Sequence, residues 1–349
     1  MQEERATPPE DDDAAALSIR TVEMHTAGEP VRIIEAGYPA LLGATLLEKR
    51  RDARDRLDRL RRLLMAEPRG HADMYGALLV PPDHALADLA VLFLHNEGYS
   101  TMCGHAVIAL GRYAVDRGLV AAVEPETEVN VQCPCGLVRA RVEVRGGRAG
   151  RVRFASVPAF ALYRDAVAIT ERFGPVTVDI GYGGAFYAVL PAAELGLDVA
   201  ASPVARLAEA AMEVKAAASR AVPISHPDDP DLAFLYGTIL TDGAEAWSDA
   251  PTSNVCVFAD GQVDRSPTGS GVTARLALMH RRGRIAVGQA RLFRSVTGGL
   301  FEGRVLEATR AGPHPAVVVE VAGEAFYTGK AVFTVEPADP LGQGFLLRR

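Results

Sequence analysis

The 349-residue sequence has little of what marks several large protein classes. It contains four cysteines and one tryptophan, and aromatic residues make up only 6% of it. No apolar run is long enough to span a bilayer, and a formal net charge of -7 argues against nucleic acid or an anionic membrane as partner. The motifs GxGxxG and GxxxxGK[ST] do not occur, so a dinucleotide site or a P-loop has no support. We therefore expect a small molecule as the partner.

The first sixteen residues, MQEERATPPEDDDAAA, lack the features of a targeting segment. They have neither the basic start nor the apolar core of a secretory signal, and their acidity counts against a mitochondrial transit peptide. We expect residues 1–16 to form a disordered acidic tail. We also expect a cytoplasmic protein whose cysteines stay reduced.

Two of the cysteines, Cys133 and Cys135, form a CPC motif. No second Cys/His pair follows at ligand spacing, so a zinc site is not expected. Apolar residues alternate with polar ones through residues 129–144, which predicts a strand or hairpin. Both thiols are then small residues of the core or of a sheet edge.

The rest of the chain reads as many strands with a few helices between them. Leucines at helical spacing predict one amphipathic helix over residues 46–70, ended by Pro68 and Gly70. Its arginines suit an anion site, but a solvated face with i,i+4 ion pairs is the favoured interpretation. A second helix is predicted over residues 203–221. Strands are predicted at residues 76–80, 89–95, 233–243 and 253–263, and after residue 284. This order indicates an α+β fold, because regular βαβ alternation is absent.

A hidden repeat relates the two halves of the chain. After a shift of 165 residues, residues 103–118 (CGHAVIALGRYAVDRG) align with residues 268–283 (TGSGVTARLALMHRRG), and five of the sixteen pairs are identical. About one identity is expected by chance. Two copies are too few for a solenoid, so we expect two similar domains facing each other across a cleft. Their predicted bounds are 17–158, with a segment of about 330–349 returning to it, and 159–329.

Both copies predict a helix that starts at the cleft. Each has a turn, then Cys103 or Thr268, then a glycine and an apolar stretch. Free N–H groups at a helix N-terminus bind anions, and the helix dipole assists, so two such starts predict a cage for a carboxylate. A thiol in this position has a lowered pKa, and we expect Cys103 to be partly thiolate near neutral pH. Thr268 ionises too weakly to transfer protons there.

Two neighbours of these positions have open roles. His105 suits a hydrogen bond to the substrate or stabilisation of the Cys103 thiolate, and the substrate role is ranked slightly ahead. Asp264 suits a cap on the approach to the helix or an ion pair with a substrate ammonium. We favour ligand binding, because a carboxylate beside a carboxylate cage makes sense for a zwitterion.

Five motifs together resemble the proline racemase family: HTAGEPVRII (25–34), EPRGH (67–71), MCGHA (102–106), DIGYGGAFYA (179–188) and DRSPTGSG (264–271). The resemblance covers essentially the whole chain after the acidic tail. It implies a fold similar to that of diaminopimelate epimerase, in which each of two similar domains is a curved, mainly antiparallel sheet around a central helix. It also implies a homodimer that needs no metal, pyridoxal phosphate or nucleotide.

The resemblance implies catalytic roles, with one departure from the racemase pattern. Racemases of the family use two cysteines on opposite faces of the substrate; Cys103 matches the first, but Thr268 stands where the second is expected. A Cys–Thr pair is similar instead to the trans-3-hydroxy-L-proline dehydratases of the family. By position, the substrate-binding residues are Gly104, His105, Asp264, Gly269 and Ser270. Gly183, Gly184 and Phe186 either line the pocket or serve as turn and core residues.

Two other functions remain open from the sequence. A racemase or epimerase whose second proton comes from water or another group is compatible with Cys103 and Asp264, although Thr268 counts against it. A catalytically silent amino-acid-binding protein on the same scaffold has no need of a reactive thiol.

Overall fold

The computed structural model describes residues 17–347, so the tail expected at residues 1–16 lies outside the described residues. Strands dominate the described chain. The strands of the first half are β1 (Ser18–Thr26), β2 (Glu29–Ala36), β3 (Tyr75–Val80), β4 (Leu89–His95), β5 (Tyr99–Ser100), β6 (Glu126–Cys133), β7 (Gly136–Arg145) and β8 (Arg148–Ala155). Those that follow are β9 (Ala159–Thr170), β10 (Gly174–Tyr182), β11 (Phe186–Pro191), β12 (Leu235–Thr241), β13 (Thr252–Phe258), β14 (Gln262–Val263), β15 (Ala290–Arg294), β16 (Leu300–Ala311), β17 (His314–Gly323) and β18 (Ala325–Thr334).

The α-helices lie between these strands. They are α1 (Leu46–Arg56), α2 (Asp58–Met65), α3 (Gly104–Asp116), α4 (Val204–Ala221) and α5 (Gly269–Arg281), with short 3-10 turns at Ala192–Leu195 and Pro230–Leu232. None of the described helices is long and apolar enough to cross a membrane. The predicted helix at 203–221 corresponds to α4, and the predicted strand at 89–95 coincides with β4.

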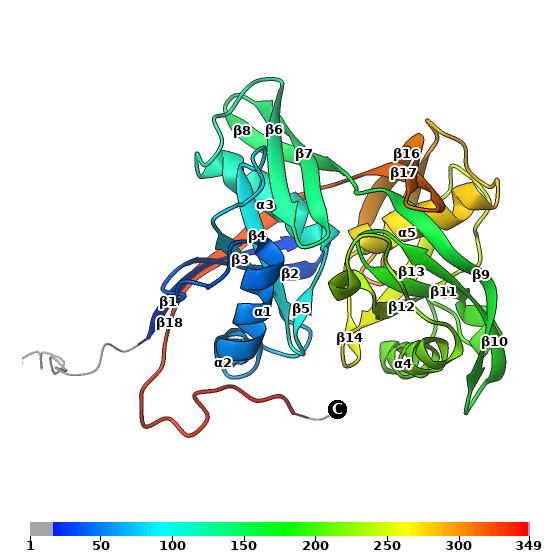
Figure 1. The fold of residues 1–349 in the computed structure, drawn as a ribbon, viewed down its shortest axis with the longest axis horizontal. Coiled ribbons are helices and arrows are strands. Elements are labelled where there is room, and N and C mark those ends of the chain that lie inside the picture. Colours follow the sequence, from blue (N-terminus) through cyan, green and yellow to red (C-terminus); the bar gives the residue numbers. More distant parts are fainter. Residues whose placement is uncertain (1–16, 348–349) are drawn as a thin grey trace, which may run out of the picture.

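Most neighbouring strands pair antiparallel, and four pairs are parallel: β2 with β3, β4 with β6, β11 with β12, and β13 with β15. Together with the few helices, this agrees with the predicted α+β class. Figure 1 shows β1–β8 with α1–α3 on one side of the molecule and β9–β13 with α4 and α5 on the other. Strand β17 pairs with both β8 and β9 and so joins the two sides, while β18 returns to pair with β1.

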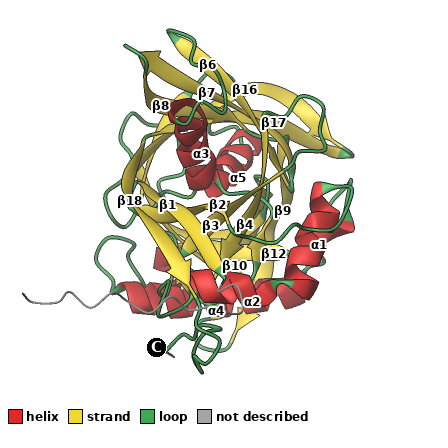
Figure 2. Cartoon of the chain, turned by 90° about the vertical axis from the view of Figure 1, so that its left-hand side faces the viewer, coloured by secondary structure: helices red, strands yellow, loops and turns green. Residues whose placement is uncertain are grey.

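The helices α3 and α5 are enclosed by strands at the centre of the molecule (Figure 2). Both are thirteen residues long, and the first and last residues of α5 lie 165 positions after those of α3, as in the sequence repeat. Each is followed by a left-handed glycine, with φ of 67° at Gly118 and 68° at Gly283. Glycine adopts this conformation at little steric cost, which explains why both copies end in Arg-Gly.

The first residues of the two central helices touch each other. A Cβ added at Gly104 would lie 2.5 Å from the Cα of Gly269, and one added at Gly269 would lie 2.6 Å from the Cα of Gly104. Only glycine permits this approach, because any side chain would push the helix starts apart. The two glycines therefore place the starts of α3 and α5 in one location.

The segment predicted as a single helix over 46–70 is two helices, α1 and α2. At Leu57 the backbone leaves the helical region, with φ of -121° and ψ of 13°. Beyond the break, the buried Arg61 guanidinium donates to the carbonyl of His95 at the end of β4. The second helix ends at Met65, before the predicted stop. The break reflects contacts with the sheet, which helical periodicity alone does not reveal.

The arginines of this segment serve the fold. Arg50 donates to the carbonyl of Tyr99, and Arg56 pairs with Asp52 one turn earlier. This agrees with the structural interpretation favoured from the sequence.

The CPC motif forms a tight turn in the β6–β7 hairpin, as the alternation predicts. Cys133 is buried and pairs with Gly136 across the turn, while Cys135 is partly exposed. The N–H of Cys135 donates to the carbonyl of Thr101, just before Cys103. The turn thus supports the approach to α3.

Candidate active site

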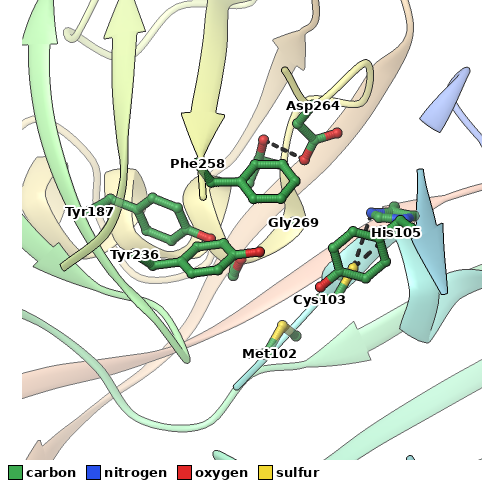
Figure 3. A pocket seen from close by; sticks show the side chains of 12 residues that line it. Met102, Cys103, His105, Tyr187, Tyr236, Phe258, Asp264 and Gly269 are labelled. Atoms are coloured by element: carbon green, nitrogen blue, oxygen red, sulfur yellow. Dashed lines mark hydrogen bonds between the residues drawn. The ribbon is translucent and has the colours of Figure 1, made fainter. Parts of the chain in front are cut away.

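One pocket brings together all seven residues singled out from the sequence: Cys103, Gly104, His105, Asp264, Thr268, Gly269 and Ser270. Figure 3 shows Cys103 and His105 on one side of it and Asp264 with Gly269 on the other. The remaining lining residues are Tyr75, Met102, Tyr187, Tyr236 and Phe258. The starts of α3 and α5 therefore meet in a pocket with largely aromatic walls.

Both helix starts present free N–H groups to this pocket. The first intrahelical bond of α3 runs from the N–H of Val107 to the carbonyl of Cys103, and that of α5 from Val272 to Thr268. The first three N–H groups of each helix thus have no partner within the helix. Such groups bind anions, so the predicted carboxylate cage has its donors in place.

Cys103 lies at the N-cap of α3 and is buried. The sequence predicted a lowered pKa for this thiol, and that prediction is wrong for the site as it stands. Burial raises the pKa of Cys103 well above its ordinary value, and the charges of Asp264 and Glu29 raise it further, whereas the N–H of Ala106 and the Tyr75 hydroxyl act in the opposite direction. Removal from water disfavours the thiolate more than the helix start favours it.

His105 contacts the thiol and leaves no ring nitrogen for the substrate. Its Nδ1 lies 3.1 Å from the Cys103 Sγ, and its Nε2 lies 3.3 Å from the carbonyl oxygen of Pro30. A carbonyl oxygen only accepts hydrogen bonds, so Nε2 carries the ring proton. Nδ1 is then unprotonated and accepts a hydrogen bond from the thiol. Burial lowers the pKa of His105 to about 3, which keeps the ring neutral. Of the two roles weighed from the sequence, the geometry favours the thiol partner over a side-chain contact with substrate.

Thr268 has an unusual backbone for a β-branched residue, with φ of 66°. Its hydroxyl donates to Asp264 Oδ2 at 2.7 Å, and its N–H donates to the Ser266 hydroxyl at 3.0 Å. These contacts hold a left-handed conformation that threonine rarely adopts. The threonine hydroxyl is thereby committed to a carboxylate instead of to proton transfer.

Asp264 belongs both to the turn before α5 and to the pocket wall. Its Oδ1 accepts the N–H of Ser266 at 2.7 Å, while its Oδ2 accepts the Thr268 hydroxyl. Burial raises the pKa of Asp264 to about 6, against the effect of these hydrogen bonds and of Arg265. The carboxylate thus orders the turn before α5 and also lines the pocket, while its ion pair with a substrate ammonium stays a prediction.

The turn that carries Asp264 is held by a residue from the first half of the chain. Glu29, which is fully buried, accepts the N–H of Arg265 at 2.7 Å. Burial and the charge of Asp264 raise the pKa of Glu29 well above its ordinary value. The Arg265 guanidinium also pairs with Asp73 at 3.1 Å. These contacts fix the turn of one helix start against strands of the other side.

The aromatic lining was not found from the sequence. Tyr75, Tyr187, Tyr236 and Phe258 lie in or next to buried strands, where aromatic residues give no local signal of a site. The Tyr187 hydroxyl lies 2.7 Å from the Ser270 Oγ, and the rings of Tyr236 and Phe258 stack with centroids 5.2 Å apart. Together they form an apolar wall with polar edges.

Three residues suggested as possible lining serve as turn and core instead. Phe186 is fully buried in a cluster with Tyr182. A Cβ added at Gly183 would lie 2.1 Å from the carbonyl oxygen of Ser270, and Gly184 has a left-handed φ of 97°. Gly183 lets the β10–β11 turn pack closely against the start of α5, and Gly184 lets it pack against Met102, just before α3.

The pocket is narrow in this structure. The space that the centre of a water molecule can reach is about 10 Å³, roughly the room for one water. A ligand the size of an amino acid therefore needs a wider pocket than the one in this structure. Among the described residues, no group of three or more His, Cys, Asp or Glu side chains is arranged to hold a metal ion.

The comparison with protein families decides the assignment suggested by the motifs. Residues 21–346 match the family model described as proline racemase. The chain belongs to the proline racemase family. Its resemblance in sequence therefore reflects membership over nearly the full length, and it includes both helix starts of the pocket.

Relatives in this family carry two kinds of name. The chain is 56% identical over 338 residues to the trans-L-3-hydroxyproline dehydratase of Xenopus tropicalis, covering 96% of this chain and 97% of the relative. It is 47% identical over 331 residues to the 3-hydroxyproline 2-epimerase of Burkholderia multivorans, covering 95% and 98%. Among solved structures, a hydroxyproline epimerase from Agrobacterium vitis with bound trans-4-OH-L-proline matches with a TM-score of 0.89 and 30% identity over 96% of both chains. The fold is thus that of the proline racemases, and the epimerases of the family share it.

Proposed function

We propose that this protein is a trans-3-hydroxy-L-proline dehydratase, a lyase that forms Δ1-pyrroline-2-carboxylate and water. The observation that carries the proposal is the unequal pair of helix starts in one pocket. Cys103 presents a thiol that is hydrogen-bonded to a neutral imidazole nitrogen, whereas the Thr268 hydroxyl is bonded to Asp264. The high identity to relatives named for this activity supports the same conclusion.

The stereochemistry of the substrate explains why one thiol suffices. In trans-3-hydroxy-L-proline the hydroxyl and the α-hydrogen both lie on the ring face opposite the carboxylate. Loss of the two groups is therefore a syn elimination that uses a single face. Cys103 serves that face, and the opposite face needs no acid or base. Thr268 then shapes the site and holds Asp264.

The thiolate forms as the substrate binds. The thiol gives its proton to water that the substrate displaces, because the His105 ring, with a pKa of about 3, stays neutral. The positively charged ring nitrogen of the substrate, paired with Asp264, favours the thiolate, because a nearby opposite charge lowers a thiol pKa. Burial of the thiol suppresses the thiolate until that charge arrives.

Elimination proceeds with the carboxylate of the substrate on the helix starts. The N–H groups of Gly104, His105, Gly269 and Ser270 bind it and stabilise the charge that develops as the α-proton leaves. Cys103 takes the α-proton, the C2=C3 double bond forms, and the C3–O bond breaks. The hydroxide takes the proton from the Cys103 thiol and leaves as water. The enamine then tautomerises to Δ1-pyrroline-2-carboxylate.

We infer that the two sides of the molecule act as two similar domains that open and close around the substrate. The narrow pocket supports this, since a ligand the size of an amino acid needs a wider one. Closure excludes water and strengthens the contacts of the carboxylate cage. We further propose that the enzyme is cytoplasmic and forms a homodimer. Sedimentation of the purified protein tests whether it is a dimer.

The proposal is tested by proton NMR in D2O, with trans-3-hydroxy-L-proline in one tube and L-proline in another. Formation of Δ1-pyrroline-2-carboxylate, with no deuterium at the Cα of proline, is the expected result. Deuteration of proline with loss of optical rotation would instead indicate a racemase with a second acid. No change in either tube would favour an amino-acid-binding protein.

A further inference from the structure

The side chain of Tyr75 has a buried hydroxyl that the fold does not use. Tyr75 begins β3 and is 2% exposed, and its ring meets the His105 ring edge to face with centroids 4.9 Å apart. Among the described residues its hydroxyl makes no hydrogen bond of ordinary geometry. It lies close enough to the Cys103 thiol, Ser100 and Tyr236 to influence their side chains, and it lowers the pKa of Cys103. The Ser100 hydroxyl itself donates to the carbonyl of Met102. A buried hydroxyl that has only neighbours at long range is costly, because it has lost its hydrogen bonds to water.

Phenylalanine would fill the same space without that cost. The ring contacts of Tyr75 with His105 and Phe258 need no oxygen. The unpaired hydroxyl is therefore not explained by packing, and it lines the pocket in which the proposed reaction takes place.

Tyr75 supplies a side-chain hydroxyl beside Cys103. The lining residues next to it are Met102, Cys103, Gly104 and His105. Methionine and glycine side chains donate nothing, and both ring nitrogens of His105 are engaged, with Pro30 and with the thiol. Tyr236, from β12, also has a hydroxyl that acts on Cys103 and Tyr75. A group on the Cys103 face of the substrate can thus meet the Tyr75 O–H directly beside the thiol.

We propose that the Tyr75 hydroxyl donates a hydrogen bond to the 3-hydroxyl of the substrate and stabilises its departure, an inference that rests on the proposed function. The leaving hydroxyl lies on the same face as the α-hydrogen, and so beside Cys103 and Tyr75. As the C3–O bond breaks, its electron pair stays on oxygen, which accepts the Tyr75 hydrogen bond and the proton of the Cys103 thiol. Tyr75 is unchanged at the end of the cycle.

Two properties of the site suit this role. Burial raises the pKa of Tyr75 well above its ordinary value, so the side chain remains an O–H donor at neutral pH. A proline without the hydroxyl leaves the donor unpaired in a buried pocket, which penalises binding of that ligand. Tyr75 therefore serves both the departure of the hydroxide and the choice of a 3-hydroxylated substrate.

The test uses the full-length Tyr75→Phe variant. Its kcat for trans-3-hydroxy-L-proline is expected to fall about 100-fold, the effect typical of removing one donor to a developing oxyanion. Affinities are then measured by calorimetry in the Cys103→Ser background, where no turnover occurs. Adding Tyr75→Phe is expected to weaken trans-3-hydroxy-L-proline about tenfold and L-proline less than twofold, because only the first ligand loses a hydrogen bond.

The matched control is Tyr182→Phe. The Tyr182 hydroxyl is also buried without a partner, but it lies in the core cluster with Phe160 outside the pocket. This variant is expected to keep kcat within about twofold, and neither variant should melt below the wild type. Equal weakening of both ligands by Tyr75→Phe, or a kcat within threefold of wild type, overturns the inference while leaving the dehydratase proposal intact. A wild-type protein that forms no Δ1-pyrroline-2-carboxylate overturns both.

Discussion

The starts of α3 and α5 share their geometry but differ in the side chains around the first glycine. Both helices are thirteen residues long and end in the same way, and their first glycines touch. Cys103 has an extended backbone, with φ of -146°, and its thiol faces an imidazole nitrogen. Thr268 has a φ of 66°, and its hydroxyl is bonded to Asp264. One copy of the repeat thus holds a thiol beside an imidazole, while the other holds an ordered carboxylate.

Removing the thiol breaks this comparison most severely. Cys103→Ser leaves only a hydroxyl at each helix start, so neither can take the α-proton, and kcat for dehydration is expected to fall at least about 1000-fold. The rate of Δ1-pyrroline-2-carboxylate formation, measured in samples quenched at set times, gives the loss of activity. Cys135→Ser, which changes the partly exposed thiol of the β6–β7 turn, is the control and should keep activity. A Cys103→Ser enzyme at near wild-type rate would show that another residue takes the α-proton.

Separating the two helix starts comes next. Gly104→Ala places a methyl group only 2.5 Å from the Cα of Gly269. We expect kcat/KM to fall about 100-fold, since misplacing catalytic groups by 1 Å has such an effect. The free energy of unfolding should fall by about 1–3 kcal/mol. Gly329→Ala in β18, where an added Cβ meets nothing within 4 Å, is the matched control. Denaturant titration and steady-state kinetics read out both effects, and equal behaviour of the two variants would contradict the close contact.

Thr268→Cys makes the two starts chemically equivalent. A second thiol on the opposite face is expected to give measurable exchange and inversion at the Cα of L-proline, while dehydration falls about tenfold through loss of the hydroxyl bonded to Asp264. Deuterium incorporation with polarimetry measures the gain. Absence of any exchange would mean that the pocket walls, and not residue 268 alone, prevent racemisation.

The smallest expected effect concerns the pH dependence of stability at Asp264. Its pKa is raised from 3.8 to about 6, so the folded state binds its proton more tightly than the unfolded state. The contribution of Asp264 to stability is then present below pH 4 and is lost as the pH rises through 6. Asp264→Asn removes this titrating carboxyl. As the pH rises from 4.5 to 7.5, the free energy of unfolding of the variant should therefore increase by about 2 kcal/mol relative to that of the wild type.

Thermal melts of both proteins at the two pH values check this trend. Titratable groups that interact with Asp264 or with its neighbours in this region include Glu29, Asp73, Tyr75, Cys103, Tyr187, Cys256 and Arg265. The raised pKa of Glu29 acts with the same sign and is present in both proteins. If Asp264→Asn instead loses stability relative to wild type as the pH rises from 4.5 to 7.5, Asp264 is stabilised as the anion.

The sequence predicts the parts of this molecule whose signals are local. The repeat at 165 residues indicates both central helices and the pairing of Cys103 with Thr268. The alternation around Cys133 indicates the β6–β7 hairpin. In each case a few adjacent residues carry the pattern, because turns, caps and strand alternation are properties of short segments.

What the sequence does not reveal depends on contacts between distant segments. Tyr75 and Tyr236 line the pocket because β3 and β12 approach the helix starts in the folded chain. The break at Leu57 follows from packing of α2 on the sheet. The pKa of Cys103 is raised by burial, which a helix start in isolation does not suggest. Charge and solvent exposure are properties of the whole fold.

The contact between Gly104 and Gly269 also says how the two copies are related in space. These residues are equivalent under the 165-residue repeat, and each is the nearest neighbour of the other. In an isologous dimer, a residue on the twofold axis contacts its own equivalent in the other subunit. For the two similar domains proposed above, we infer an arrangement like a symmetric dimer of one unit, with a pseudo-twofold axis that passes through these two glycines. Cys103 and Thr268 immediately precede them, so this symmetry is broken next to the axis.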